Sequence, residues 1–595
     1  MAQPVAILSL GPRTAGLAAR LREHLPGSRV HAPACADCPA DERFEKAVPH
    51  LQALFAAGTP IVGICAAGIL VRALGPVLAN KADEPPVLAV SEDRSVVVPL
   101  LGGHHGANDL ARRLATAVGA TAAVTTAGDT RFGLALDEPP TGWTLANPAD
   151  AKSVMARLLE GQSARLTVEA GDASWLTRSD LPLSPDGAIE LLVTPRAVAG
   201  SPDRLVYHPK ILALGAGAER GASPDALGDL VSTTLADAGL APAALACVAS
   251  IDLKADEPAL HALGYPARFF AGERLAEETD RLSTRSEIVF RETGCWGVAE
   301  GAALAATGPE GTLVVPKRVG DRVTCAVAQA STVIDPTSVG RSRGHLVVVG
   351  LGPGSADWRT AEADRLLRDA DELVGYGLYL DLVGPAGEGK PRRAFPLGEE
   401  AERCRFALAR AAEGRRVALV CSGDPGIYAL ATLVFELIEA PPDPAWARVE
   451  ITVAPGVSAM QAAAARLGAP LGHDFCAISL SDLLTPWPMI ATRLEAAAAG
   501  DFVVALYNPV SLRRREGLAK AREALLAQRG GATPVAVCRS LGRADEAVTV
   551  TTLQDLTVDQ VDMLSIVIVG SSRTRALPRG DGTTSLFTPR GYEVR

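Results

Sequence analysis

Residues 344–354 constrain the fold of this chain more than any other stretch, because they have the pattern of a buried strand that leads directly into a glycine turn. Three consecutive valines, Val347 to Val349, are typical of a strand that is covered on both faces. Gly350 and Gly352 permit positive φ and let backbone N–H groups approach a ligand closely. A helical segment is expected from about residue 357. The stretch therefore predicts a strand-turn-helix unit of the α/β class with a binding turn.

A dinucleotide site is disfavoured at this turn. Such a site requires the spacing Gly-x-Gly-x-x-Gly and an acid at the end of the next strand, about twenty residues on. Here Pro353 interrupts the glycine spacing, and the next predicted strand, residues 372–374, begins with its acid and leads into another glycine turn. The pattern therefore argues against a nicotinamide cofactor.

The same plan of strand and glycine turn returns farther along the chain. Residues 417–428 contain a predicted strand and a glycine turn with Asp424 at its rim, and residues 450–459 repeat the pattern. A further predicted strand, residues 503–509, ends in the sequence Tyr-Asn-Pro. As an ordered set, these motifs resemble the tetrapyrrole methyltransferases that use S-adenosyl-L-methionine. The resemblance covers residues 344 to about 575.

One motif narrows the resemblance within that family. Tyr507-Asn508-Pro509, followed by three arginines at 513–515, is similar to the precorrin-3B C(17)-methyltransferase branch of cobalamin biosynthesis. The resemblance implies a two-lobed fold, methyl transfer to carbon 17 of precorrin-3B with ring contraction to precorrin-4, and a homodimer through this half of the chain. The Tyr-Asn-Pro motif disfavours a uroporphyrinogen methyltransferase, and methylation of another ring carbon is the alternative.

The resemblance also implies which residues hold the cofactor, S-adenosyl-L-methionine, between the two lobes. The matching positions are Pro353, Gly423, Asp424, Ile427, Ser458, Ala459 and Tyr507. From the residues alone, Asp424 is equally suited to cap the following helix, with Pro425 at its first position, and both roles can coexist. Transfer from a sulfonium to a carbon nucleophile depends on positioning more than on acid–base chemistry.

The substrate implied by the resemblance, a precorrin ring with many carboxylates, calls for guanidinium groups in the cleft. The candidate arginines near the expected loops are Arg403, Arg405, Arg513, Arg514, Arg515, Arg539 and Arg543. We select Arg513 and Arg539 for substrate binding, although most arginines in proteins lie on the solvated surface. His473, Asp474 and Ser479 are unranked candidates for the proton transfer that ring contraction requires. Met489 and Met563 are expected to be core residues.

The first part of the chain predicts a second α/β domain. Strands and helices alternate through residues 1–141, which implies a parallel sheet with its loops at one edge. Residues 63–72, Lys81 with Asp83, residues 103–108, and Thr125-Thr126 with Asp129 resemble the cobalamin-pathway proteins that open the lactone of cobalt-precorrin-5A and release acetaldehyde.

Two adjacent histidines are the candidate catalytic residues of that reaction. His104 and His105 stand beside glycines, and such a pair can activate water while backbone N–H groups stabilise the oxyanion. The residues alone also allow a helix cap ahead of a helix that starts near Asn108. The sequence does not choose between the two histidines as the base.

The domain boundaries follow from turn-rich stretches. We expect an intermediate domain or insertion at residues 142–205, and at residues 206–333 a domain that resembles the C-terminal domain of the lactone-opening proteins. A linker at 334–343 joins these to the methyltransferase at 344–580. Gly215 and Gly217 suit a phosphate turn or, more simply, a tight strand-to-helix connection.

Composition limits the remaining possibilities. The net charge of −10 over 595 residues argues against nucleic acid as a partner. The absence of a run of eighteen apolar residues and of a signal peptide predicts a cytoplasmic protein without a membrane partner. Cys35 and Cys38 are the only close cysteine pair among ten, which suits reduced thiols better than a metal site, so no metal is expected.

The sequence as a whole predicts a bifunctional enzyme of cobalamin biosynthesis, in which a lactone-opening module is fused to a methyltransferase. A shared chain raises the effective concentration of an intermediate near the second site. The alternative is that residues 1–330 are a non-catalytic tetrapyrrole-binding module. The sequence does not settle whether the substrate carries cobalt.

Overall fold

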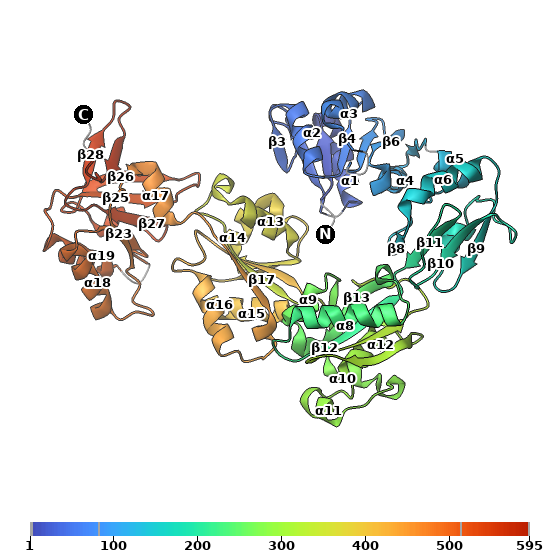
Figure 1. Ribbon diagram of the computed structural model, residues 1–595. Helices are drawn as coiled ribbons and strands as arrows, with labels where there is room; N and C mark the ends of the chain where they lie inside the picture. The colour runs from blue at the N-terminus through green and yellow to red at the C-terminus, as the bar shows by residue number, and fades with distance from the viewer. Residues whose placement is uncertain (1–3, 26, 81–83, 126, 512–514, 593–595) are drawn as a thin grey trace. The chain divides into compact units, whose positions relative to one another are not determined.

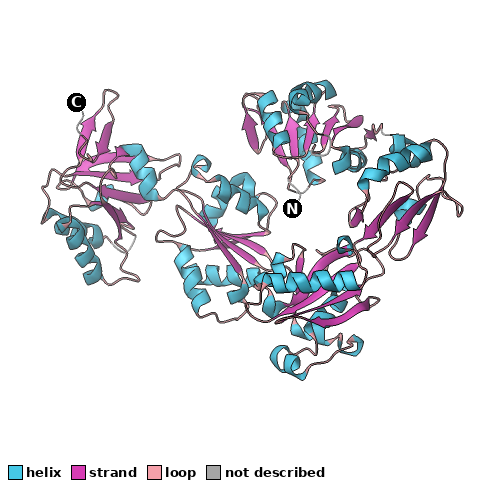
Figure 2. Cartoon of the chain, in the orientation of Figure 1, coloured by secondary structure: helices cyan, strands magenta, loops and turns pink. Residues whose placement is uncertain are grey.

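The computed structural model describes residues 4–25, 27–80, 84–125, 127–511 and 515–592. The chain forms two compact units, residues 1–342 and 343–595. Each unit contains more than one β-sheet with helices packed against it (Figures 1 and 2). No helix in the described ranges combines the length and apolar character needed to cross a membrane.

The first sheet has seven strands, and apolar side chains on both of its faces are covered by helices. Its order is β3 (Glu42–Phe44), β2 (Arg29–Pro33), β1 (Ala6–Ser9), β4 (Ile61–Ile64), β5 (Val87–Val90), β6 (Val96–Leu101) and β7 (Thr121–Ala122). One face packs against α1 (Pro12–Glu23) and α4 (Ala107–Val118), and the other against α2 (Ala47–Ala56) and α3 (Ala67–Leu74). The helix α5 (Ala127–Phe132) follows β7.

The expectation of a fully parallel sheet is wrong at one position. Strands β5 and β6 pair antiparallel, with Val90 opposite Val97. Only five residues separate the two strands, which suffices for a hairpin but not for the crossover that a parallel pair needs. Strand β3 ends at Phe44, and α2 begins three residues later at Ala47.

A smaller four-stranded sheet follows the first sheet. Its order is β8 (Trp143–Leu145), β11 (Arg204–Pro209), β10 (Ile189–Val193) and β9 (Ala164–Val168). The helices α6 (Pro148–Leu159) and α7 (Ser174–Thr177) share its core, in which Tyr207 is fully buried and donates a hydrogen bond to the Leu136 carbonyl at 2.7 Å.

The third sheet completes the first unit. Its order is β14 (Ala267–Phe270), β13 (Leu245–Ile251), β12 (Leu212–Ala218), β16 (Val323–Gln329) and β15 (Thr312–Val319). The helices around it are α8 (Pro224–Asp237), α9 (Pro258–Ala262), α10 (Gly272–Ala276), α11 (Glu287–Thr293) and α12 (Val298–Thr307). The segment predicted as a linker is paired with this sheet, because Arg341 bridges to Phe269 and forms an ion pair with Asp252 at 2.5 Å.

Gly215 is a packing residue and not part of a turn. It lies inside β12, where a Cβ atom would stand 1.8 Å from the Ala299 carbonyl oxygen of α12. The alanine-rich helix α12 therefore sits directly on the strand backbone. Both expectations for Gly215 and Gly217, a phosphate turn or a strand-to-helix connection, are wrong, because an apolar strand continues through both residues.

The second unit has two lobes, each built on a five-stranded sheet. The first sheet is parallel, in the order β19 (Arg392–Phe395), β18 (Glu372–Tyr376), β20 (Arg416–Cys421), β17 (His345–Gly350) and β21 (Glu450–Ala454). In Figure 1, α13 (Ala361–Asp369) and α14 (Gly377–Leu382) lie on one side of this sheet, and α15 (Glu400–Ala412) and α16 (Leu430–Glu439) on the other.

The second lobe is mostly antiparallel. Its sheet has the order β23 (Phe475–Ser479), β24 (Val503–Tyr507), β27 (Ser565–Val569), β25 (Pro534–Arg539) and β26 (Ala547–Thr552). One face carries α18 (Trp487–Ala499) and α19 (Glu516–Leu526), and the other carries α17 (Ala459–Leu467). A small sheet of β22 (Gly468–Ala469), β29 (Thr584–Phe587) and β28 (Arg575–Pro578) lies beyond α17 in the chain.

The close approach at Gly215 gives a stability prediction. The substitution Gly215→Ala should lower the free energy of unfolding by about 1–3 kcal/mol, because the new methyl group overlaps a backbone carbonyl that cannot rotate away. The matched control is Gly228→Ala in α8, where a Cβ meets no atom within 4 Å and alanine favours a helix by about 0.5–1 kcal/mol. Urea unfolding of both variants is the measurement, and equal midpoints would contradict the packing argument.

Candidate functional site

Three glycine turns of the first lobe pack against one another through bare backbone. A Cβ on Gly350 would lie 2.6 Å from the Gly423 carbonyl oxygen, and one on Gly456 would lie 2.2 Å from the same oxygen. Gly352 and Gly423 exchange two backbone hydrogen bonds, at 2.8 and 3.2 Å. Because no side chain fits between these glycines, the carboxyl ends of β17, β20 and β21 lie in direct backbone contact.

Asp424 fastens two of these turns together. Its Oδ1 atom accepts the Gly426 N–H at 2.8 Å, and its Oδ2 atom accepts the Gly456 N–H at 3.1 Å. The prediction that Asp424 caps the next helix is wrong, because α16 begins only at Leu430 and has no side-chain cap. Pro425 is likewise not at a first helical position. Residues 425–429, between Asp424 and the start of α16, form an irregular turn that carries Ile427 and Tyr428 toward the second lobe.

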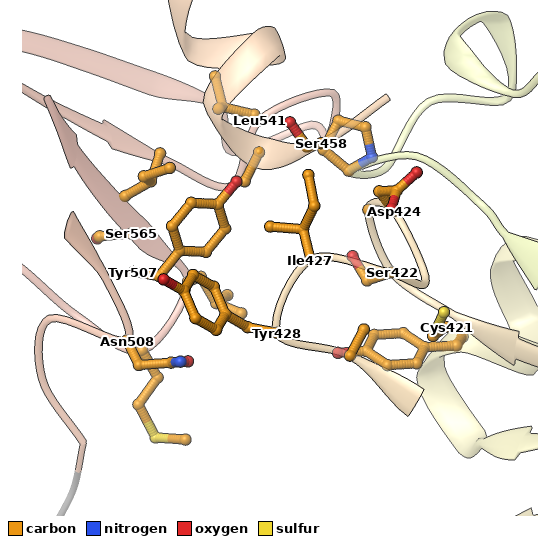
Figure 3. A pocket seen from close by; sticks show the side chains of 18 of the residues that line it. Cys421, Ser422, Asp424, Ile427, Tyr428, Ser458, Tyr507, Asn508, Leu541 and Ser565 are labelled. Carbon is orange, nitrogen blue, oxygen red and sulfur yellow. The ribbon is translucent and has the colours of Figure 1, made fainter. Parts of the chain in front are cut away.

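A cavity of about 310 Å³ opens beside these turns. All seven residues predicted to hold a cofactor line it, from four segments of the chain: Pro353, Gly423, Asp424, Ile427, Ser458, Ala459 and Tyr507. Figure 3 shows Asp424, Ile427 and Ser458 on one part of its wall, and Tyr428 and Tyr507 together on another. The volume falls in the range of small-molecule pockets, about 300–1,000 Å³.

The two tyrosines connect the lobes of this unit. Their ring centroids are 5.2 Å apart. The Tyr428 hydroxyl donates to the Ala477 carbonyl of β23 at 2.9 Å, and the Tyr507 hydroxyl accepts the Met460 N–H at 3.1 Å. Ser458 caps α17, with its side chain accepting the Gln461 N–H. The cavity wall is therefore held by hydrogen bonds from both lobes.

Backbone strain is concentrated at the cavity. Among the described residues, six that are not glycine have positive φ, and three of these line the cavity: Tyr428 at 52°, Asn508 at 49° and Ser540 at 50°. A left-handed backbone costs about 1–3 kcal/mol at such residues and is found most often at functional sites. The bulky Tyr428 is the most unusual of the three.

The titratable groups of the cavity favour positioning over acid–base chemistry. Burial raises the pKa of the Cys421 thiol to about 12 and raises the pKa values of Tyr379, Tyr428 and Tyr507 above their usual range. All four groups are protonated at neutral pH. Asp424 is the acid at the centre of the wall, and both of its oxygens already accept backbone N–H groups.

Two arginines face the cavity with incomplete hydrogen bonding. Arg403 is 2% exposed, and its guanidinium reaches the Pro396 carbonyl at 3.0 Å and Glu400 at 4.0 Å. The Nε atoms of Arg403 and Arg543 are buried and have no hydrogen-bond partner within the described structure. A buried guanidinium with unused donors suits a carboxylate ligand.

The structure places the two selected substrate arginines differently. Arg539 ends β25 and lies 3.8 Å from Asp562, outside the cavity lining. Arg513 lies outside the described residues, as does Arg514. Sequence reasoning did not identify Tyr379 and Leu397, which come from the segments around α14 and β19. Met563 was expected in the core, but it is 53% exposed and lines the cavity, so that prediction is wrong, as it is for the half-exposed Met489.

The histidine loop of the first unit is described only in part. Residues 103–105 form a short 3-10 turn between Gly102 and Gly106, both with positive φ. His105 is exposed, whereas the side chains of His104 and Asp129 lie outside the described structure, as do Lys81, Asp83 and Thr126. The helix that was expected near Asn108 begins at Ala107, and Gly106 is its N-cap without a side-chain hydrogen bond. His105 therefore does not cap it.

The site prediction concerns the two hydrogen bonds of Asp424. The substitution Asp424→Ala should lower the free energy of unfolding of the second unit by about 1.5–3 kcal/mol, because two backbone N–H groups lose a charged acceptor. Asp443→Ala is the control, since the Asp443 side chain also accepts the N–H two residues on, at 2.8 Å, and in the described structure it holds no second turn. Thermal unfolding compares them, and equal losses would mean that the bond between turns contributes nothing.

Three families match parts of this chain. Residues 345–557 match the Tetrapyrrole (Corrin/Porphyrin) Methylases, residues 212–328 the family described as Cobalamin synthesis G C-terminus, and residues 49–129 the family described as Cobalamin synthesis G N-terminal. The first match contains the three glycine turns and most of the cavity. The other two fall in the first unit, and the N-terminal match includes the histidine loop.

Two curated relatives are matched over almost their full length. A precorrin-3B C(17)-methyltransferase of Sinorhizobium is 45% identical over 249 residues, which are 42% of this chain and 97% of that protein. A probable cobalt-factor III C(17)-methyltransferase of Salmonella typhimurium is 46% identical over 249 residues, 42% of this chain and 100% of that protein.

A third relative is longer than the matched region. The cobalamin biosynthesis protein CobIJ of Mycobacterium bovis is 42% identical over 334 residues, 53% of this chain. The match covers 64% of that protein.

Proposed function

Because the chain belongs to the tetrapyrrole methylase family, we propose that it is a methyltransferase of cobalamin biosynthesis that acts on carbon 17 of precorrin-3B or of its cobalt form. The observation that carries this proposal is the cavity itself, which gathers the seven residues of the family motifs from four separate segments. The proposed reaction includes contraction of the ring to precorrin-4.

The residues of the cavity fit S-adenosyl-L-methionine as the cofactor. When bound, this cofactor supplies an activated methyl group on a sulfonium. Asp424 provides a carboxylate at the rim for hydroxyl or ammonium hydrogens, and Ile427 and Leu541 provide apolar contact. The faces of Tyr428 and Tyr507 attract a cation. Their protonated hydroxyls hold backbone partners, so these residues orient the reactants and take no proton.

The proposed substrate is an anionic macrocycle, and Arg403 and Arg543 are the arginines of the wall. We propose that they bind carboxylates of the ring, because each has a buried Nε donor without a partner in the described structure. Arg539, which lies outside the cavity lining, and Arg513 remain proposed substrate ligands. The two methyltransferase relatives are named for substrates with and without cobalt, so the proposal includes both.

The decisive experiment offers the purified chain both substrates. It is incubated with labelled S-adenosyl-L-methionine and either precorrin-3B or cobalt-factor III, and the products are analysed by mass spectrometry. One labelled methyl group on either ring supports the proposal and identifies the route. Labelling of neither, under conditions in which a known carbon-17 methyltransferase labels its substrate, would refute the assignment to carbon 17.

Arg403 gives a quantitative prediction. The substitution Arg403→Gln should lower kcat/KM for the tetrapyrrole about 10- to 100-fold, because a charge-assisted hydrogen bond contributes about 1.5–3 kcal/mol. Arg405→Gln is the matched control on the same helix, since Arg405 is exposed and pairs with Glu402. Affinity for S-adenosylhomocysteine, measured by calorimetry, should be unchanged in both variants. A loss of cofactor affinity equal to the loss of activity would contradict a role toward the substrate.

A second activity is proposed for the first unit, because two family matches fall on it. We propose that it opens the lactone of cobalt-precorrin-5A, with His104 or His105 as the base. The alternative is a tetrapyrrole-binding module without catalysis. Acetaldehyde release from cobalt-precorrin-5A should disappear in the double variant His104→Ala/His105→Ala and persist in His24→Ala. If the intact chain releases no acetaldehyde yet binds the ring, the binding module is favoured.

We also propose a homodimer through the methyltransferase half and a cytoplasmic location. None of the ten cysteines forms a disulfide, which suits a reducing compartment.

A further inference from the structure

Three potential metal ligands meet near one edge of the first sheet. They are His31 on β2, Glu42 on β3 and His50 on α2. His31 Nδ1 lies 2.9 Å from His50 Nε2 and 3.4 Å from Glu42 Oε2. The three ligand atoms all lie within 4.8 Å of one another.

The fold fixes this arrangement. Strands β2 and β3 are parallel, and His31 is directly paired with Glu42, so the two side chains project from the same face of the sheet. The chain turns after Phe44 and enters α2 at Ala47. The helix returns over that face and brings His50 onto the Phe44 ring, with ring centroids 4.8 Å apart. The three side chains are therefore held by sheet pairing and by ring stacking.

The carboxylate of Glu42 is oriented by its neighbours. Arg29 donates to Glu42 Oε1, and Glu42 Oε2 faces His31. His31 is 2% exposed. The neutral imidazole ring binds metals through the lone pair of one nitrogen. His50 and Glu42 are half-buried, so an ion can enter from solvent.

The spacing suits one small ion. A tetrahedral zinc ion with ligands at about 2.0–2.1 Å places neighbouring ligand atoms about 3.3 Å apart, close to the two shorter separations found here. Two imidazoles and one carboxylate are a ligand set of zinc sites that leave one position open. Imidazole nitrogen favours zinc, copper and nickel over magnesium and calcium, which prefer oxygen.

We propose that His31, Glu42 and His50 bind one divalent transition-metal ion of the zinc type. The sheet order separates β2 from β6, which leads into the histidine loop, by three intervening strands. At about 4.8 Å per strand this is about 19 Å. The ion therefore fastens β2, β3 and α2 together and does not reach the histidine loop. This inference is independent of the proposed methyltransferase and hydrolase activities.

The test measures zinc binding to the full chain after treatment with a chelator. Calorimetry should give one equivalent of Zn²⁺, and the ion should raise the thermal midpoint of the first unit. In the variant His50→Ala the affinity should fall at least 100-fold. The variant Glu42→Gln, which keeps the shape of the side chain, should also weaken binding. His24→Ala, which changes an exposed histidine of the same domain, should bind as the wild type does.

Further variants separate this site from other possible zinc ligands. Cys35→Ser/Cys38→Ser and His104→Ala/His105→Ala should retain the full affinity. Cobalt substitution provides a spectroscopic check, since the visible bands of a four-coordinate ion should appear in the wild type and be lost in His50→Ala. Circular dichroism confirms that each variant is folded. Zinc binding that survives His50→Ala, or that disappears in the cysteine variant, would overturn the proposal, as would the absence of binding at micromolar zinc.

Discussion

The methyltransferase half depends on the contact between the carbonyl of Gly423 and the backbone of its two neighbouring turns. This contact is backbone against backbone, so it excludes any side chain larger than hydrogen at Gly350 and Gly456. Its consequence is that three strand ends, separated by many residues in sequence, form a single rim. Asp424 holds two of the turns together by accepting two backbone hydrogen bonds. The positions of the turns in turn shape the cavity beside them. The strands β18, β20, β17 and β21 are neighbours in this order and run parallel. Their carboxyl ends therefore lie at one edge of the sheet, where the glycine turns can contact one another.

Local sequence patterns were informative where function is encoded in short segments. The strand-and-turn motifs predicted α/β units, and the family resemblance that they carry implied two lobes and seven residues that line one cavity. They failed where a pattern has two physical outcomes. Gly215 resembles a turn glycine, but it serves close helix packing, and Asp424 resembles a helix cap, but it binds a second turn instead. In both cases the deciding partner is distant in sequence, so no local rule identifies it.

Residues that meet only through tertiary structure were missed for the same reason. Tyr379 lies in the first turn of α14 and Leu397 just after β19, and neither belongs to a recognisable motif. His31, Glu42 and His50 have no familiar metal-site spacing, since their separation reflects strand register and one helical turn rather than a loop. Cys35 and Cys38 are the one cysteine pair with a familiar metal-site spacing, and they do not belong to the cluster. The two histidines of the cluster lie on either side of this pair in the sequence.

The left-handed residues around the cavity affect how the domain loses its structure. The backbone is left-handed at Tyr428, Asn508 and Ser540, and this conformation costs free energy. The cavity wall is therefore less stable than the cores of the two lobes. Local opening draws first on regions of low stability. Heat or mild denaturant should therefore disrupt the cavity before the lobes unfold, and substitutions selected for a more rigid wall would exchange flexibility at the cavity for thermal tolerance. The cavity wall is therefore the part of the domain that should open first, while the cores of the two lobes keep their structure.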